Sequence, residues 1–441
     1  MRNNRIWAGI LGVENTVVEA VEFDDELACV VVSVRPTARV GSRCGMCRRR
    51  SPGYDGGVGR RRWRALDAGL TTVIIEAWAP RVSCREHGVV VAHVPWARHG
   101  AGHTVRFDET IAWLATHCSK SAVCELMQVA WRTVGAIVDR VWADTELSFD
   151  RFAGLRRIGI DEISYKKGHK YLTVVVDHDS GRLVWAAEGR NAATLRIFFD
   201  LLGETRSTQI THVTADAAGW IAKVVAERCP DAIRCADPFH VVAWATTAVD
   251  RVRRGVWNRA RAKMVPLKKF GSRGRPRAGT GNGDDPHREQ ARSVKNSRWA
   301  LLRNPENLSG KQRVTLRQIE LHDRVLHRAY LLKESLRLVF QMRHQDAIVE
   351  LDRWIGWARR CRIPEFVALQ KSIVTHKDSI LAAIEHGLSN GRIESVNTKI
   401  RLITRVAFGF RTPDALIALA MLGLGGHPPQ LPSRNHPRMS Q

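Results

Sequence analysis

The spacing of hydrophobic residues changes along the chain, and each change predicts a different kind of secondary structure. Residues 16–35 hold two β-branched runs around the polar pair Asp24–Asp25, a pattern typical of a β-hairpin. From Phe107 onwards hydrophobic residues recur at helical spacing. After Arg156 short strand-like runs alternate with amphipathic segments. These changes predict several domains, in keeping with 441 residues, a length typical of roughly three.

The segment after Arg156 has an order of elements typical of one architecture. Three successive strands are followed by a helix, a fourth strand, a second helix and a fifth strand. This is the order of a ribonuclease-H-like core, in which the first and fourth strands are neighbours. The first strand (RIGIDEIS) ends near Asp161, the fourth (THVTAD) at Asp216 and the fifth (AIRCAD) at Asp237. We therefore expect Asp161 and Asp216 to meet.

Residues 241–388 interrupt this predicted core with mainly helical spacing, and the core resumes at SNGRIESVNTKIRLITRVAFGF. There Glu394 falls in the first turns of a predicted helix. Glu394, Asn397 and Arg401 are spaced i, i+3 and i+7, so one helical face carries a carboxylate, an amide and a cation. We expect this face to turn toward the two aspartates.

The charge of the chain predicts a phosphate-rich partner. Lys and Arg number 69 against 44 Asp and Glu, which gives a formal net charge of +25 and a pI of about 10.5. Nucleic-acid-binding domains reach such values, and a hydrophobic share of 44% indicates folded domains, not a disordered polycation. We find no apolar run long enough to span a bilayer and no signal-peptide core, so we expect a cytoplasmic protein.

Two pairs of potential metal ligands flank a stretch of alternating hydrophobicity. Cys44-Gly-Met-Cys47 is followed later by Cys84-Arg-Glu-His87. Two-residue gaps supply from tight turns the four N and S ligands that tetrahedral Zn2+ requires, so we predict a structural zinc ribbon. The alternative is two cysteine turns packed in a small core. The odd total of nine cysteines favours reduced thiols over disulfides. Arginines that could lie against a phosphate backbone crowd this module: Arg43, Arg48 to Arg50, and Arg60 to Arg64 around Trp63.

Residues 119–142 have the helix, tight turn and helix lengths of a helix-turn-helix. Ser119 is the expected N-cap of the first helix, and the candidate recognition helix runs from Ala130 to Val141. Arg132 and Thr133 would face a DNA groove. The alternative is a three-helix bundle that does not touch DNA. Four residues of the second helix are expected to pack in the core of this domain: Val134, Ile137, Val138 and Val141.

The predicted insertion contains a strongly basic stretch with no acid between Arg251 and Arg277. Within it, Arg273-Gly-Arg275-Pro276 is similar to the short arms that AT-hooks place in narrow minor grooves. We predict DNA contact by Arg273 and Arg275; a solvated loop is the alternative.

Three acids far apart in sequence suit metal-dependent phosphodiester chemistry. Hydrolysis needs an activated water and a stabilised leaving oxygen, which two divalent ions about 4 Å apart can supply. Asp161, Asp216 and Glu394 would form an oxygen-only cage suited to two Mg2+ ions, or to Mn2+ as a substitute.

Other acids near these positions could compete for the same role. Glu162 would point to the opposite face of its strand, and Asp177 with Asp179 is typical of a hairpin turn. Asp237-Pro-Phe-His240 is a stronger competitor, because it follows the fifth strand and could bring His240 to the cage as a proton carrier or phosphate contact.

Taken together, these motifs resemble the ISL-three family of insertion-sequence transposases, within the Asp-Asp-Glu recombinase group. GIDE followed by Lys-Lys-Gly-His, together with the late GRIE-x-x-N-x-K-I-R, is specific in combination, whereas the zinc and helix-turn-helix motifs are generic. The resemblance implies Asp161, Asp216 and Glu394 as the three acids and Asp237 as an accessory residue, although a shifted alignment would promote Asp237 over Asp216. It further implies binding to terminal inverted repeats and target DNA, Mg-dependent cleavage and strand transfer, at least a homodimer on DNA, and a place at the nucleoid of the bacterial cytoplasm.

The expected fold class is a multidomain α/β protein. We expect a zinc-ribbon-like β module at 1–100, a helix-turn-helix at 101–150, a ribonuclease-H-like core at 151–242 and 389–425, a basic helical insertion at 243–388, and a disordered tail at 426–441. Two other functions fit the same motifs. One is a zinc and helix-turn-helix regulator with an inactive recombinase core, and the other is a structure-specific metal-dependent nuclease.

Overall fold

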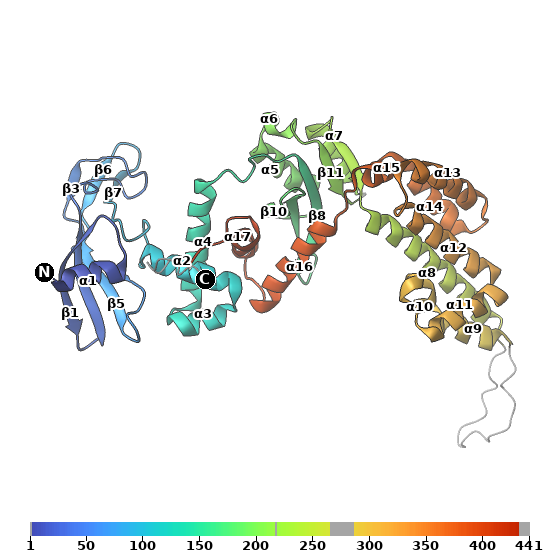
Figure 1. The fold of residues 1–441 in the computed structure, drawn as a ribbon, viewed down its shortest axis with the longest axis horizontal. Helices are drawn as coiled ribbons and strands as arrows, with labels where there is room; N and C mark the ends of the chain where they lie inside the picture. The colour runs from blue at the N-terminus through green and yellow to red at the C-terminus, as the bar shows by residue number, and fades with distance from the viewer. Residues whose placement is uncertain (1, 217, 265–285, 432–441) are drawn as a thin grey trace, which may run out of the picture. The chain divides into compact units, whose positions relative to one another are not determined.

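The computed structural model describes residues 2–216, 218–264 and 286–431 (Figure 1). The chain divides into two compact units, one of Met1–Arg151 with Lys399–Gln441 and one of Phe152–Thr398. The predicted segment 389–425 therefore contributes to both units. Arg273, Arg275 and most of the predicted tail at 426–441 lie outside the described residues.

The first unit begins with a helix and two small sheets. Its elements are α1 (Arg2–Leu11), β1 (Thr16–Asp24), β2 (Cys29–Pro36), β3 (Gly53–Asp55), β4 (Arg60–Arg64), β5 (Thr72–Trp78), β6 (Arg81–Cys84) and β7 (Gly88–Val91). One sheet has the order β1-β2-β5-β4 and the other β3-β6-β7. The predicted hairpin is confirmed, because β1 pairs antiparallel with β2 up to Asp24 and Cys29. Trp63 and Trp96 pack edge to face in its core, with ring centroids 5.5 Å apart.

Four helices complete the first unit: α2 (Val105–His117), α3 (Lys120–Met127), α4 (Trp131–Ser148) and α17 (Pro413–Leu424). The predicted N-cap is confirmed, since the Ser119 hydroxyl accepts a hydrogen bond from Ala122 N at 3.2 Å. The helix expected to end at Val141 continues to Ser148. The expected core positions of this helix are buried, and Ala418 and Leu422 of α17 pack in the same cluster.

The second unit contains a five-stranded sheet. Its elements are β8 (Arg157–Lys166), β9 (Lys170–Asp177), β10 (Leu183–Glu188), α5 (Ala192–Leu202), α6 (Glu204–Ser207), β11 (His212–Ala215), α7 (Gly219–Arg228) and β12 (Ile233–Ala236). They follow one another in the predicted order. The sheet order is β10-β9-β8-β11-β12, in which β8, β9 and β10 pair antiparallel and β8, β11 and β12 pair parallel. The first and fourth strands are therefore neighbours, as expected.

This sheet is held by a core of aliphatic and aromatic residues from the strands, α5 and α7. Phe198 and Phe199 of α5 and Val224 of α7 pack against Ile158 and Ile160 of β8, all of them nearly inaccessible to solvent. Such burial supplies most of the stability of a domain. It also holds β8 and β11 in place beside each other.

The rest of the second unit is helical, as its spacing predicts. The elements are α8 (Pro238–Ala262), α9 (Pro286–Asn296), α10 (Arg298–Leu302), the 3-10 turn η1 (Pro305–Asn307), α11 (Gly310–His322), α12 (Arg324–Val339), α13 (His344–Arg360), α14 (Pro364–Thr375), α15 (Lys377–His386) and the start of α16 (Gly391–Val406). From Lys399 onwards α16 belongs to the first unit. Trp354 is fully buried, and its indole N–H donates to Leu332 O at 2.7 Å. Leu388 and Ala383 cover Cys235 of the edge strand β12.

Candidate active site and metal centre

Two neighbouring strands bring a pair of aspartates to the same level of the sheet. The expectation that the first strand ends near Asp161 is wrong, because β8 continues past it to Lys166, whereas β11 does end just before Asp216. Parallel pairing sets Ala215 of β11 opposite Ile160 of β8, so Asp216 and Asp161 follow at the same level of the sheet. Asp161 is half-buried, and its Oδ1 accepts a hydrogen bond from Glu162 N at 2.7 Å. The pKa of Asp161 is raised to about 6, first because burial disfavours the charged form and further because Asp216 repels it.

A histidine joins Asp216 to the aspartate that ends β12. Nδ1 of His240 lies 2.6 Å from Asp216 Oδ1 and 2.6 Å from Asp237 Oδ2. These contacts, that with Asp216 first, raise the pKa of His240 to about 10. The imidazole is therefore a cation at neutral pH, because two carboxylates stabilise its charge. A charged imidazole can donate a proton or contact a phosphate, so the role of His240 as proton carrier or phosphate contact stays a prediction.

Asp237 has a different environment from Asp216. Its side chain is fully buried, caps the N-terminus of α8 and accepts from Phe239 N at 3.4 Å. Its Oδ1 also accepts from Asn390 N at 3.3 Å. The Asp216 side chain keeps 29% of its surface exposed. Asp237 is thus committed to internal contacts, whereas Asp216 is open to a ligand.

The first turns of α16 pack directly on β8. A Cβ atom added to Gly159 would lie 2.1 Å from Ile393 Cδ1, so only glycine lets the helix approach this closely. Arg392 donates to the carbonyl of Asp179 at 3.0 Å and to that of His178. Asn397 Nδ2 donates to Asp161 Oδ2 at 2.7 Å. The predicted helix face is therefore turned toward Asp161.

Glu394 lies one helical turn before Asn397, on the same side of α16. Its backbone N donates to Asn390 O at 2.8 Å. Its carboxylate is exposed and forms no ion pair or side-chain hydrogen bond within the described part of the chain. Arg401, predicted on the same face, is likewise exposed. Ligand atoms of Asp216, Asp237 and His240 thus lie within 4.8 Å of one another, whereas Asp161 and Glu394 are not part of that group. Asp161 is linked to α16 through Asn397, and the Glu394 carboxylate is unengaged.

The remaining acids near the sheet have internal partners. Glu162 forms an ion pair with Arg190, and its pKa is raised, chiefly by burial. Asp177 accepts from Asp179 N at 3.0 Å in the turn between β9 and β10, and Asp179 pairs with Arg157. The interpretation of the Asp177 pair as a hairpin turn is confirmed.

Sequence reasoning missed the residues that seat α16 on the sheet. Asn390 is 1% exposed, and neither its side-chain oxygen nor its nitrogen has a partner in the described chain. The Oδ1 atom of Asn397 is also buried without a partner. The signals were the glycine at 159 inside a strand and the Asn390–Gly391 pair at the start of α16. Orphaned buried oxygens of this kind fit a site built for a cation or bound water.

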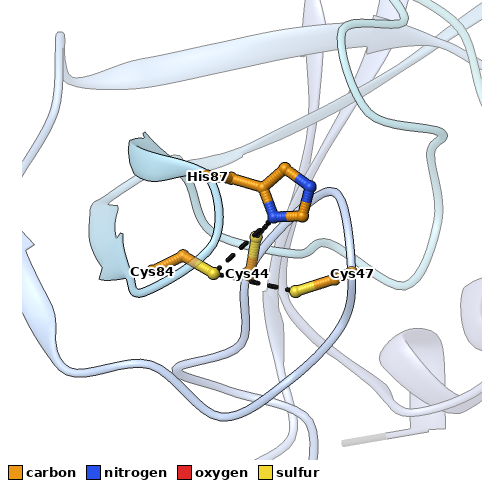
Figure 2. A group of neighbouring side chains, drawn as sticks. All are labelled: Cys44, Cys47, Cys84 and His87. Carbon is orange, nitrogen blue, oxygen red and sulfur yellow. Dashed lines mark hydrogen bonds between the residues drawn. The ribbon is translucent and has the colours of Figure 1, made fainter.

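Three cysteines and a histidine converge in the first unit (Figure 2). The Sγ atoms of Cys44 and Cys84 lie 3.8 and 3.7 Å from His87 Nδ1, and the Sγ atoms of Cys47 and Cys84 are 3.7 Å apart. Zn–S bonds of about 2.3 Å in a tetrahedron require S···S edges of about 3.8 Å. These separations fit a tetrahedral ion and are far too long for a disulfide. All nine cysteines are free thiols.

The two turns that carry these ligands are tight. Met46 N donates to Cys44 Sγ at 3.4 Å, and Cys84 pairs with Gly88 at the turn of the β6–β7 hairpin. The pKa of Cys84 is lowered to about 6, first by its hydrogen bond with His87. The thiolate is the form that binds a metal, so a cysteine that ionises readily is suited to be a ligand.

The arginines around this cluster differ in their availability. Arg49 pairs with Glu86 at 3.1 Å, Arg62 with Glu76 at 2.9 Å and Arg64 with Asp67 at 2.8 Å. Arg48 and Arg50 are exposed and form no ion pair within the described residues. Part of the predicted basic surface is therefore neutralised within the module.

The candidate recognition helix presents its predicted contact residues near its start. Arg132 is exposed and Thr133 is half-buried in the first turn of α4, whereas Val134 and Val138 face the core. Lys120 of α3 lies over the Trp131 ring, 4.9 Å from its centroid. The start of α4 thus carries polar and cationic groups on its open side.

Comparison with known proteins identifies the class to which these features belong. Residues 41–87 match the zinc finger of the transposases of IS204, IS1001, IS1096 and IS1165, and residues 92–142 match the helix-turn-helix domain of ISL3 transposases. Residues 158–420 match the DDE domain of the ISL3 family, described as a transposase. A zinc ribbon and a helix-turn-helix joined to this domain define an insertion-sequence transposase.

Whole-chain relatives agree with this class. The transposase for insertion sequence element IS1557 of Mycobacterium tuberculosis is 61% identical over 447 residues, with 100% of both chains covered. The transposase for IS1001 of Bordetella parapertussis is 26% identical over 424 residues, covering 94% of this chain and 96% of the relative. The chain belongs to the ISL3 family of transposases, and the resemblance inferred from its motifs is confirmed. Within the described residues, every helix is too short or too polar to cross a bilayer.

Proposed function

We propose that Asp161, Asp216 and Glu394 are the catalytic acids with which this transposase cleaves the ends of its element and joins them to target DNA. The observation that carries the proposal is the hydrogen bond from Asn397 to Asp161, which seats the helix of Glu394 against β8, the strand next to the one that Asp216 follows. Exposed oxygens remain on Asp216 and Glu394 for ligands. The same sheet order and helix placement support a ribonuclease-H-like core.

The donor set fits hard divalent cations. Carboxylates flanked by orphaned amide oxygens of Asn390 and Asn397 are oxygen-only ligands of the kind Mg2+ prefers, with Mn2+ as a substitute. Two such ions bound by the three acids would activate the attacking oxygen and stabilise the leaving one. Asn397 orients Asp161 by donating to one of its oxygens, and cationic His240 holds Asp216 and Asp237 in place.

Asp216, not Asp237, is proposed as the second acid. A ligand to a substrate-bound ion must be reachable, and the Asp216 side chain is 29% exposed whereas that of Asp237 is fully buried. Asp237 caps α8 and binds the backbone of Asn390. It therefore acts as a positioning residue.

Cleavage of labelled element ends tests these roles. A duplex carrying the terminal inverted repeat is incubated with Mg2+ and wild type, Asp161→Ala, Asp216→Ala or Glu394→Ala. We expect each variant to bind the ends and its cleavage rate to fall by at least a hundredfold, because all three acids are needed to bind the same metal ions. Asp200→Ala, an exposed acid of α5 paired with Arg228, is the control and should cleave normally.

Two outcomes would contradict the assignment. A fully active Asp216→Ala beside an inactive Asp237→Ala would make Asp237 the second acid. Wild type that cleaves without joining the freed 3′ ends to a target would favour a nuclease, and specific binding without cleavage would favour a regulator. The family membership favours neither of these alternatives.

We propose that Cys44, Cys47, Cys84 and His87 hold one structural Zn2+. The support is a set of ligand atoms within 4.8 Å of one another together with the zinc-finger match over residues 41–87. Metal analysis should find one zinc per chain in wild type and none in Cys44→Ser, whose first module should unfold, because small metal modules depend on the ion. Folded wild type without metal would contradict this.

The remaining proposals concern organisation on DNA. We assign residues 1–100 and 101–150, with Arg132 and Thr133, to end recognition, residues 151–242 with the first turns of α16 to catalysis, and residues 243–388, with Arg273 and Arg275, to further DNA contact. Two ends must be paired for transposition, so at least a homodimer on DNA is expected. Because the substrate is chromosomal DNA, we propose action at the nucleoid of the bacterial cytoplasm.

A further inference from the structure

Helix α16 ends in an arrangement that normally requires glycine. Phe408 N donates to Arg405 O at 3.1 Å and Gly409 N donates to Thr404 O at 2.8 Å. These two hydrogen bonds form a Schellman motif, whose left-handed position is usually glycine. Here that position is occupied by Phe408, with φ 54°. The chain therefore places a bulky side chain where its backbone conformation is unfavourable.

Phe408 is unusual among the described residues with positive φ. Apart from glycines, the others are small, polar or charged, and none has a large aliphatic or benzene side chain. Glycine immediately follows at 409, so a glycine at the left-handed position would need no new turn geometry. Backbone strain of this kind persists where the side chain has a use that offsets it.

The Phe408 ring does not serve the core of its unit. Its side chain is 88% exposed, one of the most exposed large hydrophobic residues in the described chain. Two residues later, Phe410 lines an apolar hollow together with Val406 and Leu419. The turn is therefore anchored by Phe410 while Phe408 projects away from the packed side chains.

Exposed cations occur along the same segment as Phe408, from the middle of α16 to just after the turn. Lys399, Arg401, Arg405 and Arg411 are all exposed, and none of them forms an ion pair with an acid in the part of the chain that the structure describes. Between Lys399 and Arg411 the sequence contains no acid. An exposed aromatic ring among free cations is the surface that recognises a nucleobase and its flanking phosphates.

We propose that Phe408 is a stacking residue that inserts against a base of the bound DNA, with Arg405 and Arg411 holding the phosphates on either side. The proposal rests on the transposase function and adds a DNA contact outside the metal-binding acids. An aromatic wedge between base steps unstacks them and bends the duplex. It would distort the element end for the reaction.

Base stacking is measured on inverted-repeat duplexes in which 2-aminopurine replaces each adenine in turn. Binding is carried out without added Mg2+, so that no cleavage occurs. Wild type should raise the fluorescence at one step severalfold, because an unstacked probe is no longer quenched by its neighbours. Phe408→Ala and Phe408→Gly should lose this signal and bind the ends at least about fivefold more weakly, the lower range for one ring on a base. Phe408→Trp should retain it.

Stability separates a DNA-contacting role from a structural one. Phe408→Gly relieves the left-handed strain, so its melting temperature should equal or exceed that of wild type. Leu201→Ala, which removes a 51% exposed apolar side chain next to Asp200 on α5, outside the segments assigned to end recognition, is the control and should change neither the fluorescence nor the affinity. A lower melting temperature for Phe408→Gly with unchanged fluorescence would overturn the proposal.

The test is independent of the catalytic assignment. Asp161→Ala should keep the 2-aminopurine signal while losing cleavage, since stacking does not involve the acids. If the Phe408 variants gave the wild-type signal and affinity at every probe position, the stacking proposal would fail and the role of the acids would stand. If Asp161→Ala cleaved normally, only the catalytic proposal would fail.

Discussion

At the scale of single residues, the site holds an acid in surroundings that disfavour its charged form. Asp161 is half-buried next to Asp216, which raises its pKa to about 6. Only Asn397 and one backbone N–H donate to it. An acid in this environment destabilises the folded chain until a cation or a proton neutralises it.

This conflict predicts a pH-dependent gain in stability for Asp161→Asn. Well below pH 4 the carboxyl is protonated in both folded and unfolded chains, so its ionisation contributes no difference. Between about pH 4 and 6 the unfolded chain, whose pKa is the ordinary 3.8, ionises while the folded chain stays largely protonated, so stability falls as the pH rises and levels off above about 6. At pH 8 without added Mg2+ we expect the variant to be more stable by about 1–3 kcal/mol. Thermal unfolding at pH 4 and pH 8 measures this, and an equal difference at both would contradict it.

The residues that could be predicted from sequence are those with a recognisable local pattern. Acids at strand ends, paired cysteines with two-residue gaps and the Ser119 cap each have a local signature. The bond from Asp237 to Asn390 joins residues 153 positions apart, and that from Asn397 to Asp161 joins residues 236 positions apart. Such contacts depend on how α16 packs against the sheet, which no local pattern records.

At the scale of elements, the decisive contact is between α16 and β8. Gly159 leaves room for Ile393, and Arg392 fastens the helix to the carbonyls after β9. Alternation predicted β8 and helical spacing predicted α16. How closely the two elements approach, however, depends on Gly159 having no side chain. The length of α4 was underestimated, because the sequence after Val141 continues a helix without any stop signal.

Adding a side chain at 159 should unseat α16. Gly159→Ala would set its Cβ 2.1 Å from Ile393 Cδ1 and 2.9 Å from His178 Nε2, which forces the helix or the strand to move. We expect a loss of about 1–3 kcal/mol in stability and a larger loss in end cleavage. Adding Ile393→Ala should recover part of both, because it removes the clashing atoms. Strictly additive losses in thermal unfolding would argue against this contact.

At the scale of the whole molecule, positive charge spreads over both units. Lys and Arg number 69 against 44 Asp and Glu, so there are too few acids to pair with every cation. Within the part of the chain that the structure describes, exposed arginines without an ion pair occur near the cysteine cluster and after Lys399. Composition alone predicted the partner. Composition could not predict which arginines lack an ion pair, because a pair such as Arg62 with Glu76 depends on the register of the strands.

Binding to element ends should depend steeply on salt. If six to ten phosphates are contacted, the affinity should fall by about 10³- to 10⁵-fold between 50 and 200 mM salt, as bound counterions are released. Replacing Arg405 or Arg411 by Gln should lower the slope of log K against log salt by about one each. Fluorescence anisotropy measures the slope, and an affinity insensitive to salt would rule out a binding mode dominated by phosphates.

The ligands of the cysteine cluster come from two turns separated by most of the first module, so a bound ion would close a long loop of chain. Folding of this module, which we propose binds the element ends, would then depend on the supply of zinc. In a cell starved of zinc, newly made chains would leave this module open to proteases, and the element would stay where it is in the chromosome. The transposition frequency of such an element would therefore depend on how much zinc its host cell has available.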